Sequence, residues 1–354
     1  MITDLFAVTS GIDGATAARA VPPACRRETS LPPPVTVSDR ELLFELPEWR
    51  PRTFARHLVP SLSVLADLPY AARFELSGWA DGAWSPWIAT ATIGRRVDLP
   101  GGSAMVSERH GLWAARPEPS SSSGLACDID VYTSAAALER LRLRIRVSCA
   151  EPSTLAAAPW MATLSACDLS PLASGPAAVP TSRLAVPALS QMDAPADVAL
   201  RICSPTSVAM VLAYWGLPTL LIPLAADVFH PETDRYGVWP AAIHAAGRRG
   251  LAGYLLRFPD WSSAAWCLEQ KLPIIASLSY AHGELTNAAI PETPGHLIVL
   301  TGSDPNHVFV NDPVAPTVAT VPRRYRLDEL KRAWLNHSGI GYVLFPPHYL
   351  TASK

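Results

Sequence analysis

The stretch RICSPTSVAMVLAYWG, residues 201–216, decides how the second half of the chain folds. Its apolar side chains recur at intervals of three and four residues, at positions 208, 211, 212 and 215. This is the spacing of one buried face of an α-helix. Pro205 fits the first helical turn, where its missing N–H costs nothing, and Gly216 fits the position after the last turn. The pattern predicts a helix that begins at Cys203.

A thiol at the first position of a helix faces unpaired backbone N–H groups and the positive end of the helix dipole. Both favour the thiolate, which is the reactive form of cysteine. A free cysteine is more often a small buried apolar side chain, so position alone does not decide its role. Cys203 is therefore a candidate nucleophile that needs a base from elsewhere in the chain.

Residues 295–313, about ninety positions downstream, predict a β-hairpin made of two apolar runs joined by a polar turn. If the turn is centred on Asp304, His296 lies directly opposite Asp312 on the two strands. A carboxylate at that separation can hold an imidazole in one tautomer. Asn311, the neighbouring candidate, then points to the other face. His296 is the predicted base and Asp312 its orienting carboxylate.

Gln191 precedes the candidate nucleophile by twelve residues. An amide N–H from this loop can join the backbone N–H of Cys203 in stabilising an oxyanion. Zinc binding is another use of cysteine, histidine and aspartate, but no C-x-x-C or His-x-x-x-His pair supplies a fourth ligand. We therefore expect neither a metal ion nor a cofactor.

Taken in order, these motifs resemble the bacterial papain-fold cysteine peptidases related to the bacteriocin leader-processing peptidases. The resemblance covers about residues 186–348 and rests on SQ at 190–191, CSPTSVAMVLAYWG at 203–216, GVWP at 237–240, GHLIVLTG at 295–302 and VNDP at 310–313. It implies four roles: nucleophile, base, orienting carboxylate and oxyanion donor, for Cys203, His296, Asp312 and Gln191. Many relatives have glycine where this chain has Ser204, and no membrane exporter follows in this sequence. Cleavage of double-glycine leaders is therefore not implied.

The chain as a whole is predicted to be α+β, with a β-sandwich or jelly-roll-like domain followed by a papain-like cysteine peptidase domain. We expect a flexible or irregular arm at 1–40, the β-sandwich at 41–170, a linker at 171–186, the catalytic domain at 187–348 and a tail at 349–354. Leucine, isoleucine and valine alternate with arginine along 140–147, which is typical of a strand with one buried face. A hairpin is predicted at 74–88, with its turn at 80–83.

Composition limits the other possibilities. The 354 residues suit two domains, and 49% apolar residues suffice for substantial cores. The net charge of −2 favours neither nucleic acid nor an anionic membrane as a partner. No apolar run is long enough to span a membrane, and the N-terminus lacks the basic segment of a secretory signal. The six cysteines form no paired framework, so we expect a reducing, cytoplasmic location.

The predicted function is that of a cysteine peptidase or amidohydrolase, which acts on a peptide or other acyl substrate through a thioacyl-enzyme. An acyl- or peptidyl-transferase, amide-forming or cyclising, would use the same residues. A non-catalytic binding protein is the alternative from another class. In each case the β domain could recognise a protein partner or place the substrate.

Other conspicuous residues are expected to be structural, because nothing nearby marks them as functional. These are Cys267 and His244 within helices, His307 at the shoulder of the hairpin, and the arginine-lined strand face of residues 140–146. The loop at residues 280–284 is better placed. It could form a wall of the substrate cleft.

Overall fold

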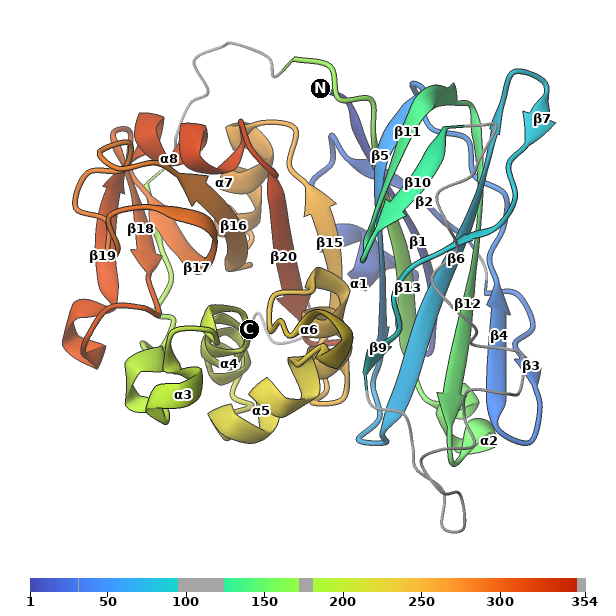
Figure 1. Cartoon of the computed structure of the whole chain (residues 1–354), viewed down its shortest axis with the longest axis horizontal. Coiled ribbons are helices and arrows are strands. Elements are labelled where there is room, and N and C mark those ends of the chain that lie inside the picture. The colour runs from blue at the N-terminus through green and yellow to red at the C-terminus, as the bar shows by residue number, and fades with distance from the viewer. Residues whose placement is uncertain (31, 95–123, 172–180, 349–354) are drawn as a thin grey trace.

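The computed structural model describes residues 1–30, 32–94, 124–171 and 181–348. Figure 1 shows two β-sheets in the N-terminal half of the chain, and beside them a third sheet that is accompanied by helices. We name these sheets A, B and C. The N-terminal half is thus β-rich and the C-terminal half mixes helices and strands, as the sequence predicts.

Sheet A has the strand order β10-β11-β5-β13-β1-β2. Its strands are β1 (Thr3–Ser10), β2 (Arg26–Ser30), β5 (Ala55–Val64), β10 (Leu125–Asp128), β11 (Val131–Leu138) and β13 (Trp160–Cys167). The pairing of β1 with β2 is parallel, and the other pairings are antiparallel. Strands β1, β5 and β13 are buried at almost every position, so side chains on both faces of the sheet are covered.

Sheet B has the order β3-β4-β12-β6-β7, and β8 and β9 also pair with β6. Its strands are β3 (Thr36–Val37), β4 (Glu41–Glu45), β6 (Tyr70–Ala80), β7 (Ala83–Trp84), β8 (Ile88–Ala89), β9 (Ile93–Gly94) and β12 (Arg140–Cys149). Sheet B packs against sheet A through aromatic residues. The ring of Phe44 meets that of Trp160 edge-on at 5.0 Å between centroids, and the Tyr132 hydroxyl donates to the Phe74 carbonyl at 3.0 Å.

Two local predictions for sheet B are confirmed. Strand β12 alternates buried apolar residues with more exposed arginines. The arginine face is not simply solvated, because the Arg142 guanidinium lies 3.9 Å from the ring centroid of Trp84, and Arg140 pairs with Glu48. The hairpin of β6 and β7 turns at Asp81 and Gly82, both with positive φ, as a two-residue turn requires.

Sheet C has the order β15-β20-β16-β17-β18-β19, and β14 pairs with β17. Its strands are β14 (Ser182–Arg183), β15 (Ala252–Arg257), β16 (Ile274–Tyr280), β17 (Thr293–Ser303), β18 (His307–Asn311), β19 (Pro322–Arg326) and β20 (Ile340–Phe345). The helices of this half are α3 (Ala196–Ala199), α4 (Cys203–Tyr214), α5 (Leu221–Val228), α6 (Trp239–Gly247), α7 (Trp261–Glu269) and α8 (Leu327–Trp334). In the view of Figure 1, α3 to α6 lie below sheet C, and α7 and α8 lie above it.

The predicted helix is α4, and it begins at Cys203 as expected. Gly216 follows it with φ of +78°, which fits a glycine just beyond a helix end. The prediction that only one face of this helix is buried is wrong, however, because every residue of Ser204–Leu212 is buried. Helix α4 is covered on all sides, since sheet C lies on one side and α5 and α6 on the other.

The prediction of a flexible or irregular arm at residues 1–40 is wrong for much of that segment. Strand β1 lies inside sheet A, between β13 and β2. It is followed by helix α1 (Gly14–Arg19), whose N-terminus is capped by the Asp13 side chain. Because both faces of β1 are covered, its sequence lacks the alternation that marks a half-buried strand.

The predicted linker, residues 171–186, also needs correction at its end. Residues 172–180 lie outside the described part of the chain. Beyond them, strand β14 already pairs with β17, and the Leu184 N–H donates to the Thr301 carbonyl at 2.6 Å. The C-terminal sheet therefore begins before residue 187.

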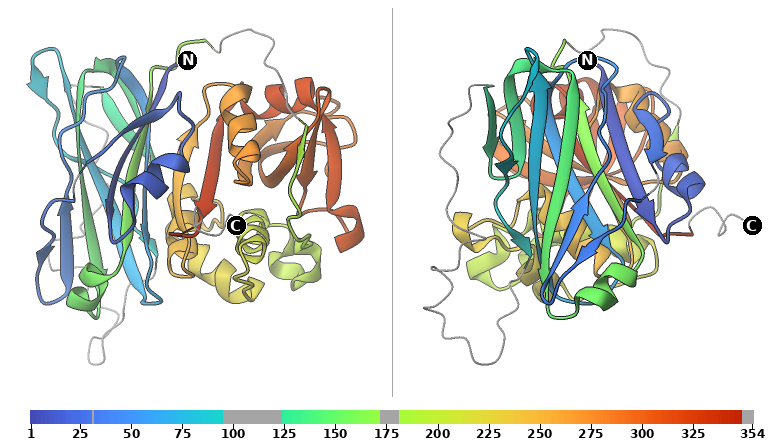
Figure 2. Two further views of the ribbon diagram at one scale, coloured as in Figure 1. Left: turned by 180° about the vertical axis from the view of Figure 1, so that it is seen from behind. Right: turned by 90° about the vertical axis from the view of Figure 1, so that its right-hand side faces the viewer.

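The two halves share one hydrophobic core across the contact of sheet A with β15 and α6. Strand β15 is an edge of sheet C, and two of its outward N–H groups donate to serine hydroxyls of sheet A. The N–H of Gly253 donates to Ser63 Oγ at 3.3 Å, and that of Arg257 donates to Ser165 Oγ at 3.1 Å. The Tyr254 hydroxyl donates to the Ala20 carbonyl, just after α1, at 2.6 Å. Figure 2 shows α1 at this boundary.

We predict that Gly247→Ala weakens the fold through this contact. A Cβ at Gly247 would lie 3.0 Å from backbone atoms of Ser63 and Val64, which cannot move aside as a flexible side chain can. Overpacking of this kind costs about 1–3 kcal/mol, against which alanine regains about 1 kcal/mol of helix propensity. Urea unfolding measures the loss. Gly14→Ala is the control, because its Cβ meets nothing within 4 Å and should leave stability unchanged or slightly raised. Equal stability of the two variants would contradict a tight contact.

Candidate active site

Cys203 is the first residue of α4, and no side chain caps this helix end. The thiol is half-buried and lines a pocket. The Ser207 hydroxyl, one turn further along, donates to the Leu297 carbonyl of β17 at 3.2 Å. This bond fixes the helix against the strand that carries His296.

His296 lies in β17, and its Nε2 is 2.7 Å from Asp312 Oδ1. Nδ1 is the ring nitrogen left to face the Cys203 thiol, which lies close enough to raise the pKa of the imidazole. Asp312 follows the last residue of β18, and its second oxygen accepts a hydrogen bond from the Tyr325 hydroxyl at 2.7 Å. The structure thus brings Cys203, His296 and Asp312 together in one chain of contacts.

The predicted strand register is wrong, although the predicted pair does meet. In the structure Leu300 lies opposite Val310, so Asp312 is two residues away from the position directly across from His296. The turn is centred beyond Asp304, whose side chain accepts hydrogen bonds from the two N–H groups after Pro305. Aspartate followed by proline often begins such a turn, so the correct position of the turn could have been predicted from Asp304 and Pro305. Diagonal neighbours remain within reach of side chains.

Asn311 points away from Cys203 and His296, as predicted. Its amide donates to the carbonyls of Val186 and Pro187 at 3.0 and 3.3 Å. The backbone N–H of Gln191 donates to the Pro313 carbonyl at 2.8 Å. The end of β18 therefore holds in place the segment that carries Gln191.

Gln191 itself is buried at the start of a 3₁₀ turn, Gln191–Asp193. Its Nε2 donates to the Ala199 carbonyl at 2.7 Å, and within the described part of the chain its Oε1 has no partner. One of the two N–H groups of the Gln191 amide thus binds the Ala199 carbonyl, and the other has no hydrogen-bond partner among the described residues. The predicted oxyanion role stays a prediction.

The electrostatics of the three groups are coupled. Burial alone would raise the pKa of the Cys203 thiol, but the hydrogen bond and charge of His296, with the N–H groups of Leu297 and Ser204, lower it overall. Burial alone would lower the pKa of His296, but Asp312 and Cys203 raise it to about 10. Burial likewise opposes ionisation of Asp312, and His296 outweighs it, so the pKa of this carboxyl is lowered. All three shifts favour the charged form of the group: the thiolate of Cys203, the imidazolium of His296 and the carboxylate of Asp312.

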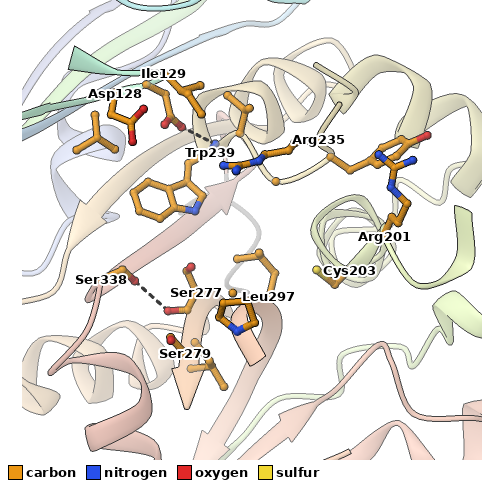
Figure 3. Close-up of a pocket in the computed structure, with 18 of the residues that line it drawn as sticks. Asp128, Ile129, Arg201, Cys203, Arg235, Trp239, Ser277, Ser279, Leu297 and Ser338 are labelled. Atoms are coloured by element: carbon orange, nitrogen blue, oxygen red, sulfur yellow. Dashed lines mark hydrogen bonds between the residues drawn. The ribbon is translucent and has the colours of Figure 1, made fainter. Parts of the chain in front are cut away.

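Beside Cys203 lies a cavity of about 670 Å³ whose walls come from both halves of the chain. Figure 3 shows Cys203 and Leu297 on one side of this cavity and Asp128 and Ile129, from the turn between β10 and β11, on another. A volume of this size is typical of small-ligand pockets. The contribution of the N-terminal half to this cavity could not be predicted from the sequence, because nothing in a short strand pair marks it as part of a distant site.

The 280–284 loop borders the first cavity, and the residues expected to be structural lie in the core or in a turn. Residues 279–281 and Glu284 line a second cavity of about 450 Å³, which shares Ser279 and Pro294 with the first, so the 280–284 loop does border the site region. Cys267 and His244 are buried, and His244 Nε2 lies 3.0 Å from the Tyr70 carbonyl. His307 pairs with Asp304 within the turn.

Within the described residues, no group of three or more histidine, cysteine, aspartate or glutamate residues is arranged to hold a metal ion. No helix in that part of the chain is long and apolar enough to cross a membrane.

Residues 183–342 match the family described as Peptidase_C39 like family. This match confirms, for the region that carries the motifs, the predicted resemblance to papain-fold peptidases of this type. It supports a cysteine peptidase activity in general terms, with a peptide as the fitting substrate. Among solved structures, a candidate C39-like peptidase from Bacillus anthracis is similar, with 16% identity, 47% of this chain and 98% of that chain covered, and a TM-score of 0.37. No curated protein matches the sequence.

We predict that iodoacetamide labels Cys203 at neutral pH well before the other five cysteines. Its pKa is lowered, whereas burial raises the pKa of Cys25 to about 12 and raises that of Cys267 further. Peptide mapping after brief labelling measures the order. If Cys203 is labelled no faster than Cys267, the prediction that Cys203 is a reactive nucleophile is wrong.

A second prediction separates Asp312 from Asn311. In Asp312→Asn the carboxylate that raises the pKa of His296 is lost, so less imidazolium is present and the pKa of Cys203 rises. The pH profile of Cys203 alkylation should therefore shift to higher pH. Asn311→Ala removes bonds to residues 186–187 only and should leave the profile unchanged. If both variants shift the pH profile by the same amount, the effect of Asp312→Asn comes from a change in the fold and not from the loss of the carboxylate beside the imidazole.

Proposed function

We propose that this protein is a cysteine peptidase or amidohydrolase in which Cys203, His296 and Asp312 act as a triad on a papain-like arrangement of helix and sheet. The observation that carries the proposal is that the His296 imidazole, held by Asp312 at 2.7 Å, lies beside the Cys203 thiol at the N-terminus of α4, where each lies close enough to shift the pKa of the other. The family match supports the same chemistry.

The reaction follows from these positions. The Cys203 sulfur attacks the carbonyl carbon of the substrate, a C–S bond forms, and the carbonyl electron pair moves to oxygen. The Cys203 N–H and the uncommitted N–H of Gln191 stabilise this oxyanion. The His296 imidazolium then gives its proton to the leaving nitrogen as the C–N bond breaks. Water, deprotonated by His296, cleaves the resulting thioacyl-enzyme and restores the thiol.

Asp312 keeps the imidazole in the useful orientation and stabilises its charged form. The Tyr325 hydroxyl satisfies the other carboxylate oxygen, so the aspartate is held from two sides. Its replacement by asparagine should lower kcat/KM by about 10²–10⁴-fold, because the amide NH₂ can donate to the imidazole nitrogen that now donates to Asp312, and this stabilises the wrong imidazole tautomer. Tyr325→Phe should lower it less, since the His296 contact remains.

The test is cleavage of a mixture of casein peptides by the full chain, read as new peptide termini by mass spectrometry. The wild type should produce termini that Cys203→Ser does not, and acid-quenched samples should carry an acyl mass on Cys203. Adding hydroxylamine should divert that acyl group to a hydroxamate. Equal termini from both proteins would overturn the proposal. Products joined to an added amine in place of free acids would instead make the protein an acyl-transferring enzyme.

A further inference from the structure

The N-terminal half supplies a wall of the cavity in which Cys203 lies. Residues 128–131 and 133, together with His57 of β5, line the cavity from this side. In Figure 3 the labelled residue Ile129 lies across the cavity from Cys203, and Trp239 of α6 lies beside this wall. The two halves of the chain therefore meet at Trp239, within the cavity.

Trp239 is the first residue of α6 and, unlike the rest of that helix, it is not fully buried. Residues 240–247 are all buried, whereas Trp239 is half-buried and lines the cavity. In Figure 3 its indole ring lies between the N-terminal wall and the labelled residues Ser277 and Leu297. An indole ring that borders a cavity offers a large apolar surface for a ligand to cover.

The backbone of Trp239 is held by Asp130, which belongs to the N-terminal half. Asp130 Oδ2 accepts a hydrogen bond from the Trp239 N–H at 2.7 Å. The first N–H groups of a helix have no acceptor within it, and Val238, the N-cap residue, provides no side-chain acceptor. Pro240 has no N–H, and the Ala241 N–H donates to the Val238 carbonyl at 3.2 Å. The start of α6 thus takes its acceptor for the Trp239 N–H from the other half of the chain.

Asp130 is itself fixed by a tight turn and is only 9% exposed. Its N–H donates to the Asp128 carbonyl at 2.7 Å, which closes the turn between β10 and β11 around Ile129. Ile129 has φ of +58°, a conformation that is costly for a β-branched side chain. The position of Asp130, and through it that of Trp239, therefore follows from the pairing of two strands of sheet A.

The charged groups near the cavity do not favour a ligand of either sign. Three carboxylates and two guanidinium groups line the cavity, and a third guanidinium group lies near His57: Asp128, Asp130, Asp234, Arg201, Arg235 and Arg257. Apolar side chains from both halves line the same space: Ile129, Val131, Trp239, Leu278 and Leu297. An apolar group of the substrate is therefore the ligand that this wall fits best.

We propose that Asp130 is a positioning residue that holds Trp239 as one wall of a subsite for a large apolar side chain of the acyl substrate. The subsite deepens the proposed function and rests on it, because the carbonyl of the same substrate reacts at Cys203. Through this contact the N-terminal half takes part in the selection of substrates, although it supplies none of the proposed catalytic groups.

The test uses two pairs of N-acetylated chloromethyl ketones. One pair carries a single residue, alanine or phenylalanine, and the other carries alanine next to the ketone with alanine or phenylalanine before it. The Cys203 sulfur displaces chloride from these probes, so labelling needs no knowledge of the natural substrate. In at least one pair, the phenylalanine probe should label wild-type Cys203 at least tenfold faster than its alanine partner, because its ring is buried against Trp239.

Four variants separate the ring from the residue that holds it. Trp239→Ala should reduce the preference for phenylalanine to less than threefold, and Trp239→Phe should keep most of it. Asp130→Ala has no acceptor for the Trp239 N–H and should also reduce the preference, mainly by weakening the reversible binding that precedes labelling. Asp130→Asn keeps an acceptor oxygen and should retain the preference. A residue that only stabilised the fold would not change the ratio between two probes.

Two controls match these variants. Asp67 also bonds across the boundary between the halves, to Arg248 at 3.0 Å, but does not line the cavity. Trp87 is 37% exposed and also lies outside the cavity lining. Asp67→Ala and Trp87→Ala should therefore keep the full preference. Circular dichroism checks that each variant folds, and Asp130→Ser, whose hydroxyl is too short to reach the Trp239 N–H, replaces Asp130→Ala if that variant does not fold.

The outcomes separate this proposal from the proposed function. If iodoacetamide labels Cys203 rapidly but neither pair shows a preference for phenylalanine, or Asp130→Ala keeps the full preference, the proposal is wrong and the nucleophile stands. Failure of both Asp130→Ala and Asp130→Ser to fold would make Asp130 a residue of the fold alone and would also overturn it. Cys203 labelling by iodoacetamide no faster than that of Cys267 overturns the proposed function, and the subsite with it.

Discussion

The burial of sheet A on both faces is the constraint on which the other features depend. An edge strand such as β15 exposes unpaired N–H groups, which must find acceptors when they are covered. Ser63 and Ser165 supply those acceptors from sheet A. Their side chains are small, so the two sheets can approach closely. One core then runs through both halves, and the cavity beside Cys203 gains a wall that the C-terminal half alone would lack.

The proposed triad residues are placed by ordinary packing, and their charges are balanced by a few specific bonds. Helix α4 is buried on all sides and is tied to β17 by the Ser207 hydroxyl, so the thiol stays near His296. A buried cation is costly unless partners surround it, and here a thiolate lies on one side and Asp312 on the other. Tyr325 gives the carboxylate a second donor. The same contacts that make these charges tolerable also set the pKa values that the chemistry needs.

The C-terminal half could be predicted from the sequence because its signals are local. The predicted helix begins at Cys203 as α4 does, and the predicted hairpin at 295–313 corresponds to strands β17 and β18. Pairing of His296 with Asp312 was also predictable, since the two lie on neighbouring strands. The register was not read correctly, because the turn was centred on Asp304 and not after it.

The N-terminal half was less predictable for the opposite reason. Strand β1 is covered on both faces, so its residues show no alternation and resemble an irregular segment. The wall of the cavity depends on contacts between residues far apart in the chain, such as that of Asp130 with Trp239, and no short motif encodes them. From the sequence alone, Asp130 would be taken for an ordinary turn residue.

This difference between local and distant signals has a consequence for function. The chemistry of a cysteine nucleophile needs only a helix N-terminus and a nearby imidazole, both of which a short motif can specify. Selectivity can also depend on groups on the far side of a cavity, and in this chain the far wall comes from the other half, whose position is set by the sheet A contact. Related catalytic motifs can therefore accompany different substrate preferences. The turn at Ile129, with φ of +58°, costs stability, and the same turn brings Asp128 and Asp130 to the cavity wall.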